Sequence, residues 1–394
     1  MHIAFIGARG VPHGYSSAEQ LALNVGKRLV ARGYEFTVYC RRNQFDDRSP
    51  VFEGINRVFL PTVEHRLLGQ IIHGFLAGLH ATTRSYDIVH VQALTNVFQS
   101  VLPWLVRRNV VINVNGEEWD NPKWPHNVRH AFFRSTVHAT LRMNPEFITD
   151  AQGMYDLYLE RYGRKSTMIG YGAEVVEPSR PELLQQYGLE PGRYFFIAAR
   201  LVPSKQLDTI VDAFNAADPT RLLAIAGGGE YGSDYVRMIK QRAGPKVRFL
   251  GMVSDQTVLD ELYANAYAYI HGASLGGINS ALLRPLGAGA PGLSADTPVN
   301  REVLERPDGS YCGLLWRTQD QLVEAITRFD EDENLVASLS ERSVRQVRER
   351  FSWDLVADQY EAYYRGVVAK LPPEEIRRRV NQARDRHLEP LGQG

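Results

Sequence analysis

The stretch Tyr194-Phe-Phe-Ile-Ala-Ala-Arg-Leu-Val-Pro-Ser-Lys205 joins a short apolar run to a polar loop, and an amphipathic helical pattern follows it. This order predicts a βα unit of a parallel sheet. The loop carries two cations, Arg200 and Lys205, where the strand ends and the helix begins. Ligands of open α/β sheets bind beyond the carboxyl ends of the strands. We therefore favour a ligand-binding role for these cations over ordinary surface charge.

The same alternation of strand and helix extends in both directions from this stretch. The strands are expected at residues 3–6, 35–40, 87–92, 110–115 and 147–149, and then at 194–199, 222–226, 247–250, 268–271 and 292–294. A proline-containing interval at residues 171–191 separates the two series. Two successive parallel sheets imply two doubly wound domains, and 394 residues are enough for two cores. Helices are expected to follow at residues 319–329, 333–351, 353–368 and 373–386.

The composition excludes several classes of protein. The chain is 44% hydrophobic, which excludes intrinsic disorder, and its 45 basic residues balance 45 acidic ones, so an anionic ligand must be held by local groups. Cys40 and Cys312 form neither a disulfide framework nor a metal motif, which favours a cytoplasmic setting. The N-terminus lacks the pattern of a signal peptide, and the apolar residues 71–81 are too few to span a bilayer.

Two glycine-rich loops follow predicted strands. The backbone amides of Gly7-Ala-Arg-Gly-Val-Pro-His-Gly-Tyr-Ser-Ser-Ala-Glu19 suit a phosphate or a sugar. An equally weighted alternative is that Gly7 and Gly10 have the structural role of shaping a turn, while Ser16 or Ser17 caps the helix. Gly227-Gly-Gly-Glu-Tyr-Gly232 fits the dinucleotide fingerprint in letters, but Gly251 ends the next strand where that fingerprint needs an acidic residue. Hydride transfer with NAD is therefore a remote alternative.

A third loop lies within Tyr269-Ile-His-Gly-Ala-Ser-Leu-Gly-Gly-Ile-Asn-Ser-Ala-Leu-Leu-Arg284 and again leads from a strand into a helix. Asn279 or Ser280 is expected to cap this helix, whose free amides would face the same ligand. His271 alone is more often a structural histidine. We interpret Asp330-Glu-Asp332 as a solvated linker rather than a metal-binding motif, and Arg377-Arg378-Arg379 as a solvated helix face.

In their order along the chain, these features resemble glycosyltransferase family 4, which has GT-B architecture. The resemblance rests on the N-terminal glycine loop, Arg200, Lys205, Gly227-Gly228, Phe249-Leu-Gly-Met-Val253, Gly276-Gly277 and Phe351-Ser-Trp353. Further motifs are similar to those of the bacterial rhamnosyltransferase-like subgroup of surface polysaccharide pathways. They are Arg9-Gly-Val-Pro12, Asn115-Gly-Glu-Glu-Trp119, Gly170-Tyr-Gly-Ala-Glu174, Tyr269-Ile-His-Gly272 and Asn300-Arg-Glu-Val-Leu304.

The resemblance implies a fold and a reaction. The fold would be α/β, with two Rossmann-like domains facing a central cleft. Residues 1–176, completed by helices in 353–394, would bind the acceptor, and residues 177–352 would bind the donor. The reaction would move a hexosyl or deoxyhexosyl, rhamnose-like unit from a nucleotide-diphosphate sugar to a hydroxyl acceptor, with retention, in polysaccharide or glycoconjugate biosynthesis. No metal or other cofactor, nucleic acid or transmembrane segment is expected, and peripheral membrane contact is compatible with this assignment.

The resemblance also assigns individual residues. Arg200 and Lys205 match cations that neutralise the departing diphosphate, which agrees with the charge that gathers on a leaving phosphate, and Asn115 occupies the polar catalytic position. The donor-binding residues would be Gly10, Ser16, Ser17, Gly228, Met252, Val253, His271, Gly276, Gly277, Ile278, Asn279, Ser280 and Arg284. The acceptor-binding residues would be His13, Glu118 and Trp119.

Three positions depart from the family pattern. Gly276 and Arg284 stand where the family has two glutamates, Ser16-Ser17 replaces a glycine pair, and Asn115 replaces His or Asp and cannot act as an acid or base. An alternative function is therefore a catalytically silent protein that binds nucleotide sugar or supports a partner enzyme. Arg284 could pair with the diphosphate or another acidic group of a substrate, form a salt bridge in the ribose site, or turn outward.

Overall fold

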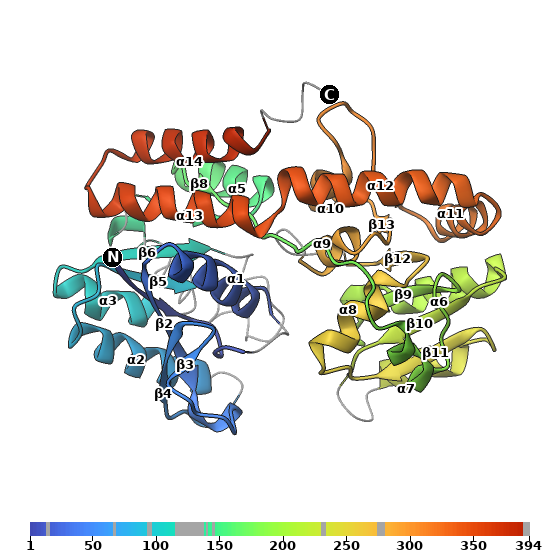
Figure 1. The fold of residues 1–394 in the computed structure, drawn as a ribbon, viewed down its shortest axis with the longest axis horizontal. Coiled ribbons are helices and arrows are strands. Elements are labelled where there is room, and N and C mark those ends of the chain that lie inside the picture. The colour runs from blue at the N-terminus through green and yellow to red at the C-terminus, as the bar shows by residue number, and fades with distance from the viewer. Residues whose placement is uncertain are drawn as a thin grey trace. The chain divides into compact units, whose positions relative to one another are not determined.

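The computed structural model describes residues 1–12, 16–65, 68–92, 97–114, 138, 141–143, 146–229, 234–273 and 280–388. The chain divides into two compact units, residues 1–171 with 353–394, and residues 172–352 (Figure 1). The boundary falls slightly before residue 176, where the sequence placed it. Each unit contains a mainly parallel sheet with helices packed on it, so the predicted α/β fold class is confirmed.

The first unit is built on an eight-stranded sheet in the order β3-β4-β2-β1-β5-β6-β7-β8. Its strands are β1 (His2–Ile6), β2 (Glu35–Arg41), β3 (Val51–Phe52), β4 (Ile55–Leu60), β5 (Ile88–Gln92), β6 (Asn109–Val114), β7 (Ile148–Thr149) and β8 (Thr167–Met168). Among the described strands of this sheet, only the short hairpin of β3 and β4 is antiparallel. The helices are α1 (Ser17–Ala31), α2 (Leu68–Thr82), α3 (Val97–Leu105), α5 (Gln152–Tyr162), α13 (Trp353–Val368) and α14 (Pro373–Leu388).

Helix α13 belongs to this first unit although it follows the second in sequence. Its apolar face is buried, including Tyr360 and Tyr364. The hydroxyl of Tyr364 lies 2.8 Å from His90 Nδ1 on β5, and Asn113 Nδ2 on β6 donates to the Tyr360 hydroxyl at 2.9 Å. These contacts fix α13 across two central strands, so the C-terminal helices are part of the first unit.

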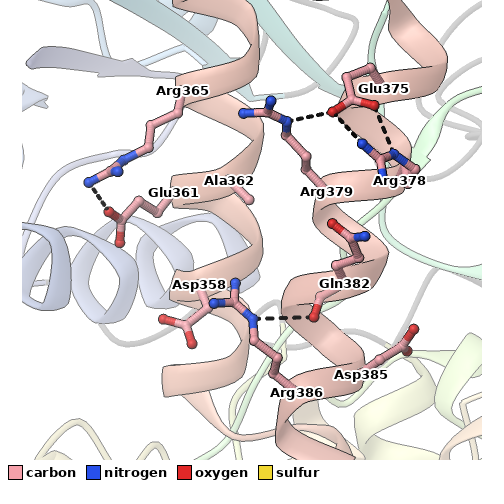
Figure 2. A pocket seen from close by; sticks show the side chains of 10 residues that line it. All are labelled: Asp358, Glu361, Ala362, Arg365, Glu375, Arg378, Arg379, Gln382, Asp385 and Arg386. Carbon is pink, nitrogen blue, oxygen red and sulfur yellow. Dashed lines mark hydrogen bonds and ion pairs between the residues drawn. The ribbon is translucent and has the colours of Figure 1, made fainter.

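The arginine cluster on α14 is less solvated than the sequence suggested. Arg377 donates to the buried Glu146 at 2.6 Å and anchors the helix to the first unit. Arg378 and Arg379 do lie on the outside, where both bind Glu375 along a groove between α13 and α14 (Figure 2). Four arginines and four carboxylates line this groove, so its charges are balanced. The interpretation as a solvated face is therefore wrong for Arg377 and right for its two neighbours.

The second unit is built on a six-stranded parallel sheet in the order β11-β10-β9-β12-β13-β14. Its strands are β9 (Tyr194–Ala198), β10 (Leu222–Ala226), β11 (Val247–Gly251), β12 (Ala268–His271), β13 (Gly292–Ala295) and β14 (Gly313–Trp316). The helices are α6 (Leu207–Ala217), α7 (Asp234–Arg242), α8 (Gln256–Ala264), α9 (Ser280–Gly287), α10 (Pro298–Leu304), α11 (Gln319–Glu331) and α12 (Glu333–Arg350). Buried residues of β9, β10 and β12 form its core with α6 and α11, including Phe195, Leu223 and Ile270.

The acidic triplet at residues 330–332 is structural, and its interpretation as a solvated linker was wrong. Asp330 lies in the last turn of α11, where it accepts a hydrogen bond from the buried Arg221 at 2.9 Å. Asp332 is the N-cap of α12 and accepts a hydrogen bond from the backbone N–H of Leu335 at 2.9 Å. Both carboxylates are thus occupied by contacts within the unit.

Candidate functional site

The topology of the second sheet predicts where a ligand binds. From β9 the chain moves to β10 and β11 on one side, and then returns to the other side of β9 with β12. The strand order therefore reverses between β9 and β12. Ligands of such sheets bind at this switch point, beyond the carboxyl ends of the strands. The loop after β9 contains Arg200 and Lys205, and β12 ends with His271 followed by Gly272.

These two loops pack closely against each other. A Cβ atom at Gly272 would lie 2.3 Å from the carbonyl oxygen of Lys205, so only glycine allows this approach without a backbone shift. Gln206 Nε2 also donates to the Gly272 carbonyl at 2.9 Å. We call Arg200, Lys205 and His271 the switch-point cluster, because they converge on the site that the topology defines.

The switch-point cluster carries positive charge that no carboxylate of the described residues neutralises. Arg200 is exposed and Lys205 half-buried, and neither forms an ion pair with a described acidic residue. Burial, together with the charge of Arg200, lowers the pKa of Lys205. Burial and the Lys205 charge lower the pKa of His271 to about 3, so the imidazole is neutral at physiological pH. Two cations beside a neutral imidazole suit an anion such as a phosphate or diphosphate.

The neighbouring strand ends bring further predicted residues to the same edge of the sheet. Leu201 N–H, in the loop after β9, donates to the Gly228 carbonyl at 3.1 Å, and Gly227 N–H donates to the Gly251 carbonyl at 2.7 Å. Gly227 has φ +143°, and a Cβ atom there would meet the Ala199 carbonyl oxygen at 1.9 Å.

The residues after β11 differ in exposure. Met252 is 60% exposed, whereas Val253 is buried, and a Cβ atom at Gly228 would lie 2.9 Å from the Met252 methyl carbon. The loops after β9, β10 and β11 therefore form a continuous surface beside the switch-point cluster.

Arg284 lies behind this edge and is held by α8. Its Nη2 atom lies 2.7 Å from Asp260 Oδ1 and 3.1 Å from Gln256 Oε1, and its guanidinium lies over the Tyr263 ring at 5.2 Å from the centroid. The side chain is 20% exposed. The interpretation that Arg284 turns outward is therefore wrong. Of the alternatives, the contacts correspond to a salt bridge, which ties α9 to α8.

Aromatic side chains link Arg284 to the switch-point cluster. Tyr263 packs on Tyr269 of β12 with ring centroids 5.8 Å apart, and Tyr269 stacks on His271 at 6.0 Å. The Tyr269 hydroxyl donates to the Ala198 carbonyl at the end of β9. Helix α9 begins at Ser280, one of the predicted donor-binding residues.

The first sheet has a similar switch point, between β1 and β5. Gly7 follows β1 with φ +113°, and a Cβ atom there would lie 2.4 Å from the Gln92 carbonyl at the end of β5. Gly10 has φ +136° and packs against Cys40. Ser16 is the N-cap of α1, and Ser17 is its first residue. Both glycines therefore shape the turn, since a Cβ at either position would meet atoms of this chain. Binding of a phosphate or sugar by this loop stays a prediction.

Sequence reasoning missed the role of Glu19 in this loop. The side chain is 1% exposed, and its carboxylate accepts from the backbone N–H of Ser16 at 2.8 Å and of Arg9 at 3.2 Å. The signal was present, since Ser16 and Glu19 have the spacing of a capping box. Glu19 therefore joins the start of α1 to the loop that follows β1.

Several predicted site residues lie outside the described part of the chain. They are the catalytic candidate Asn115, the acceptor-binding candidates His13, Glu118 and Trp119, and the donor-binding candidates Gly276, Gly277, Ile278 and Asn279. Their roles stay predictions.

Two family models match the chain, one on each side of the boundary. The model described as Glycosyltransferase Family 4 matches residues 18–174, and the model described as Glycosyl transferases group 1 matches residues 179–346. A comparison with curated protein sequences gave no significant match.

Three solved structures share the fold of this chain. Sucrose-phosphate synthase from Thermosynechococcus elongatus is 16% identical with a TM-score of 0.75, over 93% of this chain and 99% of that one. Anabaena HepE in complex with UDP-glucose is 18% identical with a TM-score of 0.72, over 94% and 100%. The catalytic domain of starch synthase IV from Arabidopsis thaliana, bound to ADP and acarbose, is 15% identical with a TM-score of 0.70, over 93% of this chain and 99% of that one.

Proposed function

Because the chain is a glycosyltransferase of GT-B architecture, we propose that it transfers a sugar from a nucleotide-diphosphate donor to a hydroxyl acceptor. The observation that carries this proposal is the switch-point cluster. Arg200 and Lys205 have no ion-pair partner among the described residues and stand at the position where sheets of this topology bind ligands. The structure of HepE in complex with UDP-glucose supports a nucleotide sugar as the donor.

The proposed roles follow from the charges. When the bond between the anomeric carbon and the phosphate oxygen breaks, negative charge gathers on the departing diphosphate. Fixed cations stabilise that charge more in the transition state than in the ground state, which accelerates the reaction. Arg200, a planar fork of donors, and Lys205, a compact charge, supply this stabilisation without a metal ion. His271, neutral because of its low pKa, adds no third positive charge.

We extend the proposal to the transferred sugar, the product and the stereochemistry, on the basis of the sequence motifs. The transferred unit is a hexose or a rhamnose-like deoxyhexose, and the product belongs to a polysaccharide or glycoconjugate. The configuration is retained when the acceptor hydroxyl attacks from the side of the leaving group and passes its proton to the departing phosphate. A cytoplasmic setting agrees with two free, buried cysteines, Cys40 and Cys312.

Turnover of labelled nucleotide sugars tests the proposal. The full chain would be incubated with uridine, guanosine, adenosine and thymidine diphosphate sugars, in EDTA and with added Mg²⁺. We expect transfer or slow hydrolysis of one donor in EDTA, and retention of configuration by NMR of the product. Tight nucleotide binding without turnover of any donor would instead establish the catalytically silent alternative. Absence of both binding and turnover would refute the proposal.

Arg193 provides a matched control for the cations, because it is exposed and precedes β9 whereas Arg200 follows it. Arg200→Ala should reduce kcat/KM, and Arg193→Ala should leave it unchanged.

A further inference from the structure

Exposed apolar side chains of the described residues gather in one part of the first unit. Eight of the twelve large apolar side chains that are exposed lie between residues 63 and 106. Four of them follow one face of α2 at helical spacing: Leu68, Ile72, Phe75 and Leu79, each 36% to 51% exposed. Helix α2 is therefore apolar on the side that faces solvent.

The neighbouring helix α3 continues this surface. The two helices contact each other and pack on strands of the first sheet (Figure 1). At and beyond the end of α3, Trp104, Leu105 and Val106 are 43% to 61% exposed. Neither helix contains a single Asp, Glu, Lys or Arg residue. A surface helix of a water-soluble protein normally carries charged residues on its outer face, so this surface is built for a partner that excludes water.

Arginines stand at one end of this apolar surface. Arg84 follows α2, and Arg107 and Arg108 follow α3. Because β5 and β6 pair in parallel from Ile88 and Asn109 onward, the ends of both helices reach the same edge of the sheet. None of the three arginines forms an ion pair with a carboxylate in the part of the chain that is described.

Acidic residues are scarce in this region. Between residues 61 and 114 the only two are Glu64, which precedes α2, and Asp87. Asp87 Oδ2 already accepts from the backbone N–H of His2 at 2.7 Å. An apolar face edged by unpaired cations therefore faces solvent, despite the overall charge balance of the chain.

We propose that the outer face of α2 and α3 docks on an anionic lipid membrane, with its apolar side chains in the interface and Arg84, Arg107 and Arg108 on lipid phosphates. No described helix has the length and apolar character of a membrane span, so this is contact from one side. Such contact is stabilised by buried apolar area and by attraction of cations to anionic headgroups. A second copy of the chain fits less well, because Glu64 and Asp87 are the only carboxylates between residues 61 and 114 and are too few to pair with three arginines.

Sedimentation with lipid vesicles tests this proposal, which is independent of the transferase activity. The full chain should bind vesicles of phosphatidylcholine with phosphatidylglycerol, and bind them more weakly at high salt and in pure phosphatidylcholine. F75S/L79S should weaken binding at least about tenfold, since two large apolar side chains leave the interface. R84Q/R107Q should weaken binding to anionic vesicles by about fivefold for each arginine.

Matched controls have the same chemistry elsewhere on the first unit. V51S/L159S removes two apolar side chains that are 49% and 37% exposed, and R42Q/R48Q removes two exposed arginines. Both controls should bind as the unchanged protein does. Lipids brominated on the acyl chains should quench tryptophan fluorescence, and W104F should lose part of this quenching. Because phenylalanine keeps an aromatic ring at position 104, this variant tests the contact of Trp104 with the acyl chains.

Three results would overturn the proposal. They are equal binding by F75S/L79S and V51S/L159S, no binding of the unchanged protein to anionic vesicles, and a dimer in solution that F75S/L79S dissociates while vesicles have no effect. The last result would assign the face to a second copy of the chain.

Discussion

Replacement of Arg284 by methionine should destabilise the second unit without weakening diphosphate binding. Methionine keeps an unbranched apolar stem but removes the salt bridge to Asp260, the hydrogen bond to Gln256 and the contact with the Tyr263 ring. The ion pair is partly exposed, with side chains 20% and 40% accessible, so its contribution is at most about 1 kcal/mol. The hydrogen bond and the ring contact each contribute on the order of 1 kcal/mol or less.

These contributions are not additive, and we expect a total loss of about 2 kcal/mol. In a unit of this size, that lowers Tm by roughly 4 to 8 °C. Thermal unfolding followed by circular dichroism would measure the change, with Arg193→Met as the control at an exposed position. The charge-reversed pair R284E/D260R should recover part of the lost stability, whereas R284E alone should be less stable than R284M because it places two carboxylates together.

Ligand titration separates this account from direct contact with the substrate. Affinities for a nucleoside, its monophosphate and its diphosphate should be the same within about twofold in R284M and in the unchanged protein. An unchanged Tm combined with a selective loss of diphosphate affinity would refute the reasoning, because Arg284 would then reach the ligand rather than α8.

Two further predictions concern a buried histidine and a glycine. His90 is buried, and burial lowers its pKa to about 4, so the unfolded chain binds a proton more readily and the stability present above about pH 6.5 is lost as pH falls toward 4. Urea unfolding at pH 6.5 and at pH 4 measures how much free energy of unfolding is lost in acid. This loss should be smaller by up to about 3 kcal/mol in His90→Gln than in the exposed control His138→Gln, and equal losses would contradict a low pKa for His90. Gly272→Ala should displace the Lys205 backbone and cost about 1 to 3 kcal/mol of stability as well as donor affinity, since its Cβ would lie 2.3 Å from a carbonyl oxygen. Gly153→Ala, where a Cβ meets no atom within 4 Å, is the control, and equal effects of the two changes would show that the close approach at Gly272 is unimportant.

Apolar runs located the central strands of both sheets, because strands buried on both faces need continuous apolar sequence. Strand β4 was not predicted, because Arg57 interrupts its apolar run. The guanidinium is buried only because Asp47 and the carbonyls of Ser49 and Val11 accept its hydrogen bonds. Such compensation comes from other parts of the chain, so a local pattern does not reveal it.

In the candidate site, too, the sequence predicted some residues but not their distant partners. The predicted strand ends identified Arg200, Lys205 and His271, because the carboxyl ends of parallel strands lie at the same edge of the sheet. The partner of Arg284 could not be identified in this way, since Asp260 lies on a different helix. Likewise, Arg377 reads as one of three surface arginines until the fold brings Glu146 to it. Pairings between residues far apart in sequence depend on tertiary structure, and local spacing carries no signal for them.

The central claim is that Arg200 and Lys205 bind the diphosphate of the donor. It is tested most directly by calorimetric titration of a nucleoside and its diphosphate into the unchanged protein, R200A, Lys205→Ala and R193A, with the base that binds best among uridine, guanosine, adenosine and thymidine. We predict that the diphosphate binds more tightly than the nucleoside, and that R200A and Lys205→Ala each reduce this advantage at least about tenfold, as expected for a lost charge-assisted contact. R193A should retain it in full. An undiminished advantage in both R200A and Lys205→Ala would contradict the claim.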